Sequence, residues 1–277
     1  MTGKRIFCLQ LLAGLSVGFS GTLIAASGPD ILNPTQAVLT VGCVNCGEYE
    51  YTDGVTPKAA YAANWKRLFA ENPADIWFKE DTVESRDPNK CIEAVTVRQP
   101  VSNDIVTMIG TSPEGTTARR YVRRLAYKVA DRRIAFYGVH LVAESHISKK
   151  KGLDGMSPSQ RLRQRQFAEL IEDARKFDDA VFAGDFNAQE PWEYEIFRSS
   201  GYACANCSER FGTEATLRDI PADNIIVSSG LLIEKFDVLK TPKLDTDHFP
   251  LVARLTILRK KSVGIRAWRR PCREQDE

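Results

Sequence analysis

An apolar run that ends in an acid and an amide is the clearest chemical signal in this sequence. Residues 181–189 read Val-Phe-Ala-Gly-Asp-Phe-Asn-Ala-Gln, and the first three lack the alternation of a half-exposed strand. This pattern predicts a buried strand that ends at a glycine, where the backbone can turn sharply. Asp185 and Asn187 are two residues apart, so in extended geometry their side chains point the same way and can serve one site. An Asx turn, in which the two residues only cap their own backbone, fits this stretch equally well.

Polar residues that can bind a metal or move a proton stand at other predicted strand boundaries. They are Asn45 after residues 37–44, Glu80 after 76–79, His140 after 134–139, Asp223 before 225–228, and Asp247 with His248 before 250–253. Carboxylate and amide oxygens suit hard divalent cations, and histidine suits phosphate binding or proton transfer. This set fits a metal-assisted phosphoester hydrolase, which must place a metal on the phosphate, aim a water and neutralise growing charge.

The order of these motifs resembles the endonuclease/exonuclease/phosphatase superfamily, which includes pancreatic-type deoxyribonucleases, abasic-site endonucleases, neutral sphingomyelinases and inositol-phosphate phosphatases. The match runs from about Val38 to Leu255, and although each motif alone is weak, six in the right order are specific. The resemblance implies an α+β fold, a four-layer sandwich of two packed mixed β-sheets flanked by helices, with the site at one edge. It also implies an enzyme, a metal-dependent phosphoric ester hydrolase.

The resemblance further implies a metal site. Glu80 stands where the superfamily has its principal ligand, with Asn45 and Asp247 in support, and the expected ion is Mg²⁺, with Mn²⁺ or Ca²⁺ as alternatives. An exposed loop acid is the plainer interpretation of Glu80. The sequence departs from the family at Lys79, which replaces a common Gln, and at Thr246, which replaces a common Ser.

The remaining motif residues receive catalytic roles from the same resemblance. Asp185 orients and deprotonates the attacking water, while Asn187 donates to the phosphate or holds that water. His248 faces the phosphate, with its ring tautomer fixed by Asp223, and His140 is the second phosphate-facing histidine. A lone histidine is usually structural, but the chain has only three and two of them fall on motif positions.

The net charge and the distribution of arginines indicate which class of substrate the protein could bind. A formal net charge of +2 is too small to indicate a nucleic-acid binder, but arginines crowd residues 119–133. Such clusters suit DNA, RNA or anionic lipid headgroups, although a solvated face is the alternative. We expect Arg123 and Arg120 to bind substrate. Alternation along a strand puts Arg123 and Arg124 on opposite faces, so only one of these two serves that role.

The ends of the chain and its cysteines indicate export. Residues 1–27 resemble a secretory signal peptide, residues 28–258 form one catalytic domain and residues 259–277 a basic tail. An uncleaved membrane anchor is the alternative for the first segment. We predict a periplasmic or secreted protein whose mature cysteines form disulfides of open connectivity, with an unpaired Cys272 in the tail as the alternative for that residue. A four-thiolate zinc site or a redox Cys-x-x-Cys motif also fits the two closely spaced pairs.

Periodicity predicts more strands than helices. Helices are expected at residues 58–70, 159–177 and 191–199, and strands at 37–44, 75–79, 92–98, 105–109, 122–129, 134–139, 181–183, 224–228, 233–239 and 251–258. The leading hypothesis is an exported endonuclease that hydrolyses DNA or RNA by in-line water attack. A phospholipid phosphodiesterase or phosphatase of the sphingomyelinase or phosphoinositide type is the alternative, as is a catalytically silent binding protein on the same scaffold. The sequence leaves the oligomeric state open.

Overall fold

The computed structural model describes residues 31–32, 38–46, 58–80, 92–111, 115, 117–129, 131–143, 155–240 and 246–258. The predicted signal peptide and basic tail lie outside these residues, as do Cys91, Cys272 and the loop at residues 47–57. None of the helices in the described ranges is long and apolar enough to cross a membrane.

The described strands form two mixed sheets. The larger has seven strands: β1 (Ile31–Leu32), β5 (Ser102–Thr111), β6 (Thr117–Val129), β7 (Arg132–His140), β8 (Asp179–Asp185), β9 (Tyr202–Cys204) and β10 (Asp223–Ser228), in the order β1-β6-β7-β8-β10-β9 with β5 also paired to β6. The smaller has five: β2 (Val38–Asn45), β3 (Ile76–Glu80), β4 (Ile92–Thr96), β11 (Leu231–Val238) and β12 (Leu251–Ile257), in the order β11-β12-β2-β3-β4. Parallel pairs β7 with β8 and β2 with β3 lie at the middle of the two sheets.

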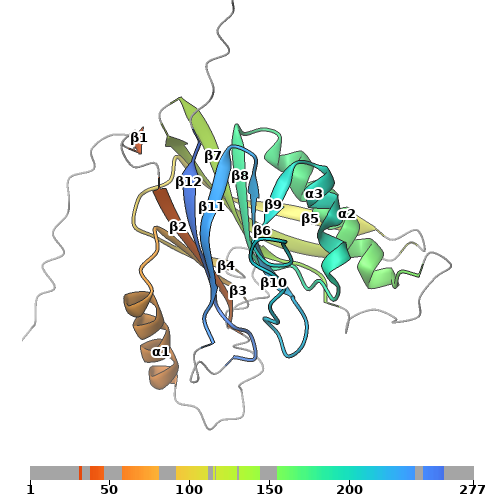
Figure 1. The fold of residues 1–277 in the computed structure, drawn as a ribbon, viewed down its shortest axis with the longest axis horizontal. Helices are drawn as coiled ribbons and strands as arrows, with labels where there is room; N and C mark the ends of the chain where they lie inside the picture. The colour runs from red at the N-terminus through yellow and green to blue at the C-terminus, as the bar shows by residue number, and fades with distance from the viewer. Residues whose placement is uncertain are drawn as a thin grey trace, which may run out of the picture.

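The sheets pack face to face, and helices cover their outer faces (Figure 1). Helix α1 (Lys58–Glu71) packs Trp65 and Leu68 against Trp77 of the smaller sheet. Helix α2 (Pro158–Ala174), the 3₁₀ turn η2 (Pro191–Tyr194) and α3 (Glu195–Ser199) cover the larger sheet, with Phe167 and Phe197 in its outer core. The predicted α+β four-layer sandwich is therefore confirmed.

Helix α2 shows how local sequence sets an element. Ser157 caps the helix in a reciprocal capping box with Gln160, and Pro158 occupies the first turn, where no intrahelical N–H bond is lost. Leu162, Phe167 and other apolar residues at helical spacing are buried against the larger sheet. The helix ends at Ala174, three residues before the predicted end at 177.

The disulfide prediction is wrong for the four described cysteines, Cys43, Cys46, Cys204 and Cys207, which are buried thiols. Cys43 packs between the sheets and Cys46 packs with α1, because residues three apart on a strand face opposite sides. Cys204 and Cys207 lie in the outer core of the larger sheet, where burial raises their thiol pKa values to about 12 and about 11. Since the two pairs occupy different clusters, the four-thiolate zinc alternative fails as well.

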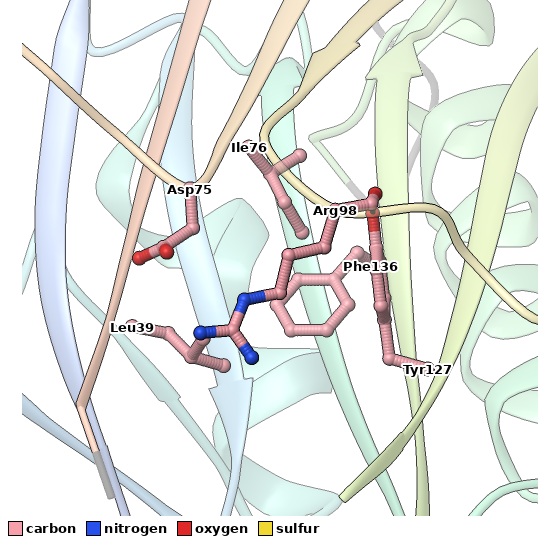
Figure 2. Close-up of a pocket in the computed structure, with 6 residues that line it drawn as sticks. All are labelled: Leu39, Asp75, Ile76, Arg98, Tyr127 and Phe136. Atoms are coloured by element: carbon pink, nitrogen blue, oxygen red, sulfur yellow. Dashed lines mark hydrogen bonds between the residues drawn. The ribbon is translucent and has the colours of Figure 1, made fainter. Parts of the chain in front are cut away.

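A small pocket lies at one end of the sandwich (Figure 2), near the beginnings of β2 and β3. It is lined by Leu39, Asp75, Ile76, Arg98, Tyr127 and Phe136, and the Arg98 side chain extends across it. The lining offers aliphatic and aromatic surface with one acid and no histidine. The predicted metal ligands Asn45 and Glu80 stand at the other ends of these two strands, so this pocket is separate from them.

A buried ion pair braces the segment that comes after β8. Arg163 of α2 and Glu193 of η2 are both fully buried, and Nε of Arg163 donates to Oε2 of Glu193 at 2.9 Å. Oε1 of Glu193 also accepts from the backbone N–H of Gln189 at 2.8 Å, while Nη1 of Arg163 donates to the Val142 carbonyl at 3.4 Å. One pair thus holds both the stretch after His140 and the stretch after Asp185.

We expect Arg163→Met to lower the free energy of unfolding by about 3–5 kcal/mol, because it leaves the Glu193 charge buried without its cation. Urea denaturation measures this loss. The double variant Arg163→Met with Glu193→Gln should recover part of it, since no buried charge is then left uncompensated. Losses that simply added in the double variant would contradict this account.

Candidate active site

Five strands begin or end in a polar residue on the face that they turn toward the other sheet. In the larger sheet, Asp185 is the register partner of both His140 and Asp223. In the smaller sheet, Asn45 is the register partner of Glu80. The structure therefore aligns these residues in two rows, one at the end of each sheet.

Strand alternation explains why these residues share a face with the core. On β8, Val181 and Ala183 pack between the sheets, and Asp185 is the next residue with the same orientation. On β10, Asp223 stands two residues before Ile225, another member of the same core. The inter-sheet core therefore ends in a layer of acids, amides and a histidine.

Gly184 makes the close approach of the rows possible. Its φ of 138° lies in a region that favours glycine. A Cβ atom there would collide with the Val139 carbonyl oxygen and would lie 2.7 Å from Oε1 of Glu80. Any residue with a Cβ atom at this position would push the Glu80 carboxylate away from β8. The close contact between Glu80 and the backbone of β8 therefore requires glycine at position 184.

Asp185 is the most heavily bonded acid of the site. Its Oδ2 accepts from Nδ2 of Asn45 at 2.8 Å, a bond that joins the two rows, and from Nδ2 of Asn187 at 3.0 Å. Nε2 of His140 and Nε2 of His248 lie 3.7 and 3.9 Å from the same oxygen. Burial and the charge of Asp223 raise the pKa of Asp185, although the two histidines and Asn45 oppose this. A carboxylate with a raised pKa is a better proton acceptor.

Asn187 orients Asp185 from a left-handed backbone conformation, with φ of 53°. Its N–H donates to Oδ1 of Asp185 at 2.7 Å, so the Asx turn does form. Its Nδ2 donates to Oδ2 of Asp185 and, at 3.1 Å, to the Leu141 carbonyl. Because both amide hydrogens are used in this way, the side-chain oxygen of Asn187 is the atom suited to a water.

Asp223 and His248 form a buried pair, with Oδ2 of Asp223 2.9 Å from Nδ1 of the ring. Burial alone would lower the pKa of His248, but the charge and hydrogen bond of Asp223 and the charges of Asp185 and Asp247 raise it to about 10. His248 is therefore an imidazolium at neutral pH, with Nε2 on the side of Asp185.

The predicted metal ligands are Asn45 at the end of β2, Glu80 at the end of β3 and Asp247 beside His248. Asn45 and Glu80 are buried, and Asp247 is exposed with Oδ1 3.9 Å from Nε2 of His248. Burial and the charges of Glu80, Asp223 and Asp185 all raise the pKa of the Cys43 thiol beneath them. Among the described residues, Asp185, Asp223 and His248 offer metal-ligand atoms that all lie within 4.8 Å of one another. Concentrated negative charge of this kind is what a divalent cation balances.

The two predicted substrate-binding arginines lie on opposite faces of β6. Arg123 is the partner of Gly138, whose added Cβ would meet Phe78 in the inter-sheet core, so Arg123 faces the side of the site. Arg120 pairs with Met108, which packs in the outer core under α2. The prediction that both serve one substrate surface is wrong for Arg120, because three residues along a strand reverse the face.

Arg124 has a structural role on the outer face of the larger sheet. Its guanidinium bonds to Asp104 at 2.9 Å and to Asp173 of α2 at 2.7 Å, and it lies over the ring of Phe177. Of the Arg123 and Arg124 pair, Arg123 is therefore the one on the site's face of the sheet.

Two threonines hold the site together and received no role from the sequence. Oγ1 of Thr246 donates to the Asn45 carbonyl at 2.7 Å and accepts from the N–H of His248 at 3.1 Å. Oγ1 of Thr216 accepts from the N–H of Asp223 at 2.9 Å. The Thr216 carbonyl accepts from the N–H of Phe249 at 2.8 Å, so Thr216 bonds both Asp223 and the residue that follows His248. No sequence pattern singles out Thr216, which lies in an irregular stretch.

Comparisons with known proteins find similarity in structure and not in sequence. No family model matches the chain, and no curated protein matches its sequence. The catalytic domain of human Nocturnin with bound sulfate matches with a TM-score of 0.59 and 17% identity over 80% of this chain and 95% of that one. An endonuclease/exonuclease/phosphatase family protein from Bacteroides thetaiotaomicron matches with a TM-score of 0.58 and 15% identity, over 79% and 95% of the chains.

TDP2 from D. rerio, complexed with a single-strand DNA product, matches with a TM-score of 0.55 and 12% identity over 79% of this chain and 99% of that one. At these identities the matches establish the architecture. Their shared feature is the sandwich of two sheets described above, over nearly the whole length of each relative. This protein therefore has the fold of the endonuclease/exonuclease/phosphatase superfamily, as its motifs predicted.

Proposed function

We propose that this protein is a metal-dependent phosphodiesterase that hydrolyses DNA or RNA as an endonuclease. One observation carries the proposal. The hydrogen bond from Asn45 to Asp185 joins a row of oxygen ligands on one sheet to a row of acid, base and histidine groups on the other. A phosphodiester hydrolase needs these two sets on either side of one phosphate.

Glu80, Asn45 and Asp247 would hold the ion, and their donor chemistry fits Mg²⁺, or Mn²⁺ or Ca²⁺ in its place. All three offer oxygen, the donor that these hard cations prefer. The charges of Glu80, Asp223 and Asp185 each raise the pKa of the Cys43 thiol, so all three acids act on that one residue. When bound, the ion supplies positive charge to a phosphate oxygen and so stabilises the transition state.

The chain's own residues carry the proton transfers. Asp185, with its raised pKa, accepts a proton from the attacking water, and the side-chain oxygen of Asn187 holds that water. The His248 imidazolium donates Nε2–H to a phosphate oxygen while Asp223 keeps the other ring nitrogen bonded. His140, half-exposed beside Asp185, offers a second contact to the phosphate. Hydrogen bonds between charged groups in a buried site stabilise charge more than they would in water.

Arg123 on the site's face supports a polyanionic substrate. Export is the second part of the proposal, and it rests on residues 1–27, with their basic start and apolar stretch. The buried thiols of the described cysteines are compatible with either an oxidising or a reducing compartment.

A substrate panel tests the proposal. The purified protein should nick plasmid DNA or degrade RNA when Mg²⁺ or Mn²⁺ is present and should lose this activity in excess chelator. Sphingomyelin and phosphoinositides in the same panel should remain intact. Hydrolysis of a lipid without hydrolysis of a polynucleotide would replace the nuclease with a lipid phosphodiesterase, and inactivity on every substrate would favour a silent scaffold.

Asp185→Asn and His248→Ala should each reduce kcat by about 10²- to 10⁴-fold, because each removes a proton acceptor or a charged donor from the reaction. Steady-state rates on a synthetic diester measure this. Asp131→Asn is the matched control, since Asp131 is exposed in the turn before β7, at the other end of that strand from His140. Near-normal turnover in either site variant would refute the assigned mechanism.

The pH dependence of protein stability reports on the Asp223–His248 pair. The pKa of His248 is raised from about 6.5 in the unfolded chain to about 10 in the fold. Its stabilisation is therefore fully present below about pH 6.5 and is lost as the pH rises through about 10. In chelator, the stability advantage of the wild type over His248→Gln should shrink between pH 7 and 10. An advantage that stayed constant over this range would mean that the ring is neutral in the fold.

A further inference from the structure

Strands β5 and β6 form a hairpin that extends beyond the strands beside it. The pairing of β5 with β6 runs without a register shift from Ser102 and Ala126 to Thr111 and Thr117. The pairing of β6 with β7 runs only from Val129 to Arg123. The half of β6 that precedes Arg123 is therefore paired on one side only, within the part of the chain that the structure describes.

The two faces of this hairpin are different. Met108 and Val122 point to the outer core and are buried beneath α2. The opposite face carries three cross-strand pairs, Ile105 with Arg123, Thr107 with Tyr121, and Ile109 with Arg119. Thr107, Ile109 and Arg119 are exposed, and the other three are half-exposed. This second face, which we name the hairpin face, is thus accessible as far as the described residues go.

The hairpin face continues the catalytic layer. Arg123 is level with Gly138 on β7, where the pairing of the two strands ends. His140 lies two residues beyond Gly138 on the same face of β7, and Tyr121 lies two residues beyond Arg123 on the same face of β6. Nε of Arg123 donates to Oδ1 of Asn103 at 2.9 Å and Nη1 donates to the Ile92 carbonyl at 2.8 Å. These two bonds fix the plane of the guanidinium and leave further N–H donors for an anion. Going outward along β6, the face presents a cation, an aromatic ring and another cation.

Arginine and tyrosine alternating in this way have the chemistry of a single-strand nucleic-acid surface. Same-face residues on a strand recur about every 7 Å. Arginine binds phosphate oxygens, and a tyrosine ring stacks on an unpaired base, which a duplex does not present. We propose that the hairpin face binds a single-stranded segment of the substrate, with Arg119 on a phosphate and Tyr121 under a base next to the scissile phosphate. This inference rests on the proposed function and deepens it by naming the form of its substrate.

Binding without cleavage tests the proposal. Fluorescence anisotropy of a labelled oligothymidylate is measured with the full chain in chelator, across a series of salt concentrations. Arg119→Gln should weaken binding and reduce the slope of log K against log salt by about 0.7, the value for one phosphate contact on a single strand. Arg120→Gln is the matched control, because it makes the same change of charge on the opposite face of the same strand. It should leave both quantities unchanged.

The aromatic contact is tested by a second pair of variants. Tyr121→Leu should weaken oligothymidylate binding by about tenfold, while Tyr121→Phe keeps the ring and should bind as the wild type does. Thermal unfolding of each variant verifies that the fold is intact. Equal losses in the Leu and Phe variants would exclude stacking.

The hairpin face would not be a nucleic-acid surface if the wild type failed to bind oligothymidylate, or if Arg119→Gln and Arg120→Gln changed its affinity equally. Vesicles that contain phosphatidylserine are tested in the same way. Binding to these vesicles without binding to oligothymidylate would also overturn the proposal. A small diester separates this proposal from the proposed function. Arg119→Gln should cleave bis(p-nitrophenyl) phosphate as fast as the wild type. If the wild type bound oligothymidylate as predicted but never cleaved that diester with any divalent metal, the proposed function would fail and the binding surface would stand.

Discussion

Strand alternation links the core of this protein to its site. Each strand that carries a site residue also carries core residues on the same face, so a shift of one residue would bury the acid among apolar side chains of the outer core. Gly184 adds a second constraint, because only a residue without Cβ lets the Glu80 carboxylate approach the backbone of β8. The position of every site group along its strand is therefore fixed by the same packing that stabilises the sandwich.

Electrostatics set the character of the site. Burial, followed by the charge of Asp223, raises the pKa of Asp185. The same field keeps His248 protonated. Such an arrangement is costly for an apo fold and is what a bound cation and a phosphate substrate would relieve. The hydrogen bonds of Asn45, Asn187 and Thr246 hold these repelling groups in place.

Local pattern in the sequence predicted most of the strands, and the resemblance carried by the strand-end motifs predicted the four-layer fold. Apolar runs bounded by Asn, Glu, His or Asp indicated both the strands and the strand ends where the site forms. Prediction failed where partners are distant in the chain. Arg120 was assigned to the wrong face because an arginine cluster carries no information on orientation. Disulfides were expected from the predicted export and the even number of mature cysteines, although the four described cysteines are buried thiols, with Cys43 and Cys46 in different clusters from Cys204 and Cys207. Thr216 contacts Asp223 and the residue after His248 through a stretch without regular structure.

Manganese binding tests the central claim, that Glu80 and its neighbours hold a metal beside the acid and histidine row of the larger sheet. Titration of the full chain with Mn²⁺, followed by electron paramagnetic resonance of the free ion, should show a bound ion at micromolar protein. Glu80→Gln should abolish this binding, while Glu93→Gln, an exposed acid on the neighbouring strand β4, should bind as the wild type does. Full manganese binding by Glu80→Gln, or none by the wild type, would contradict the account.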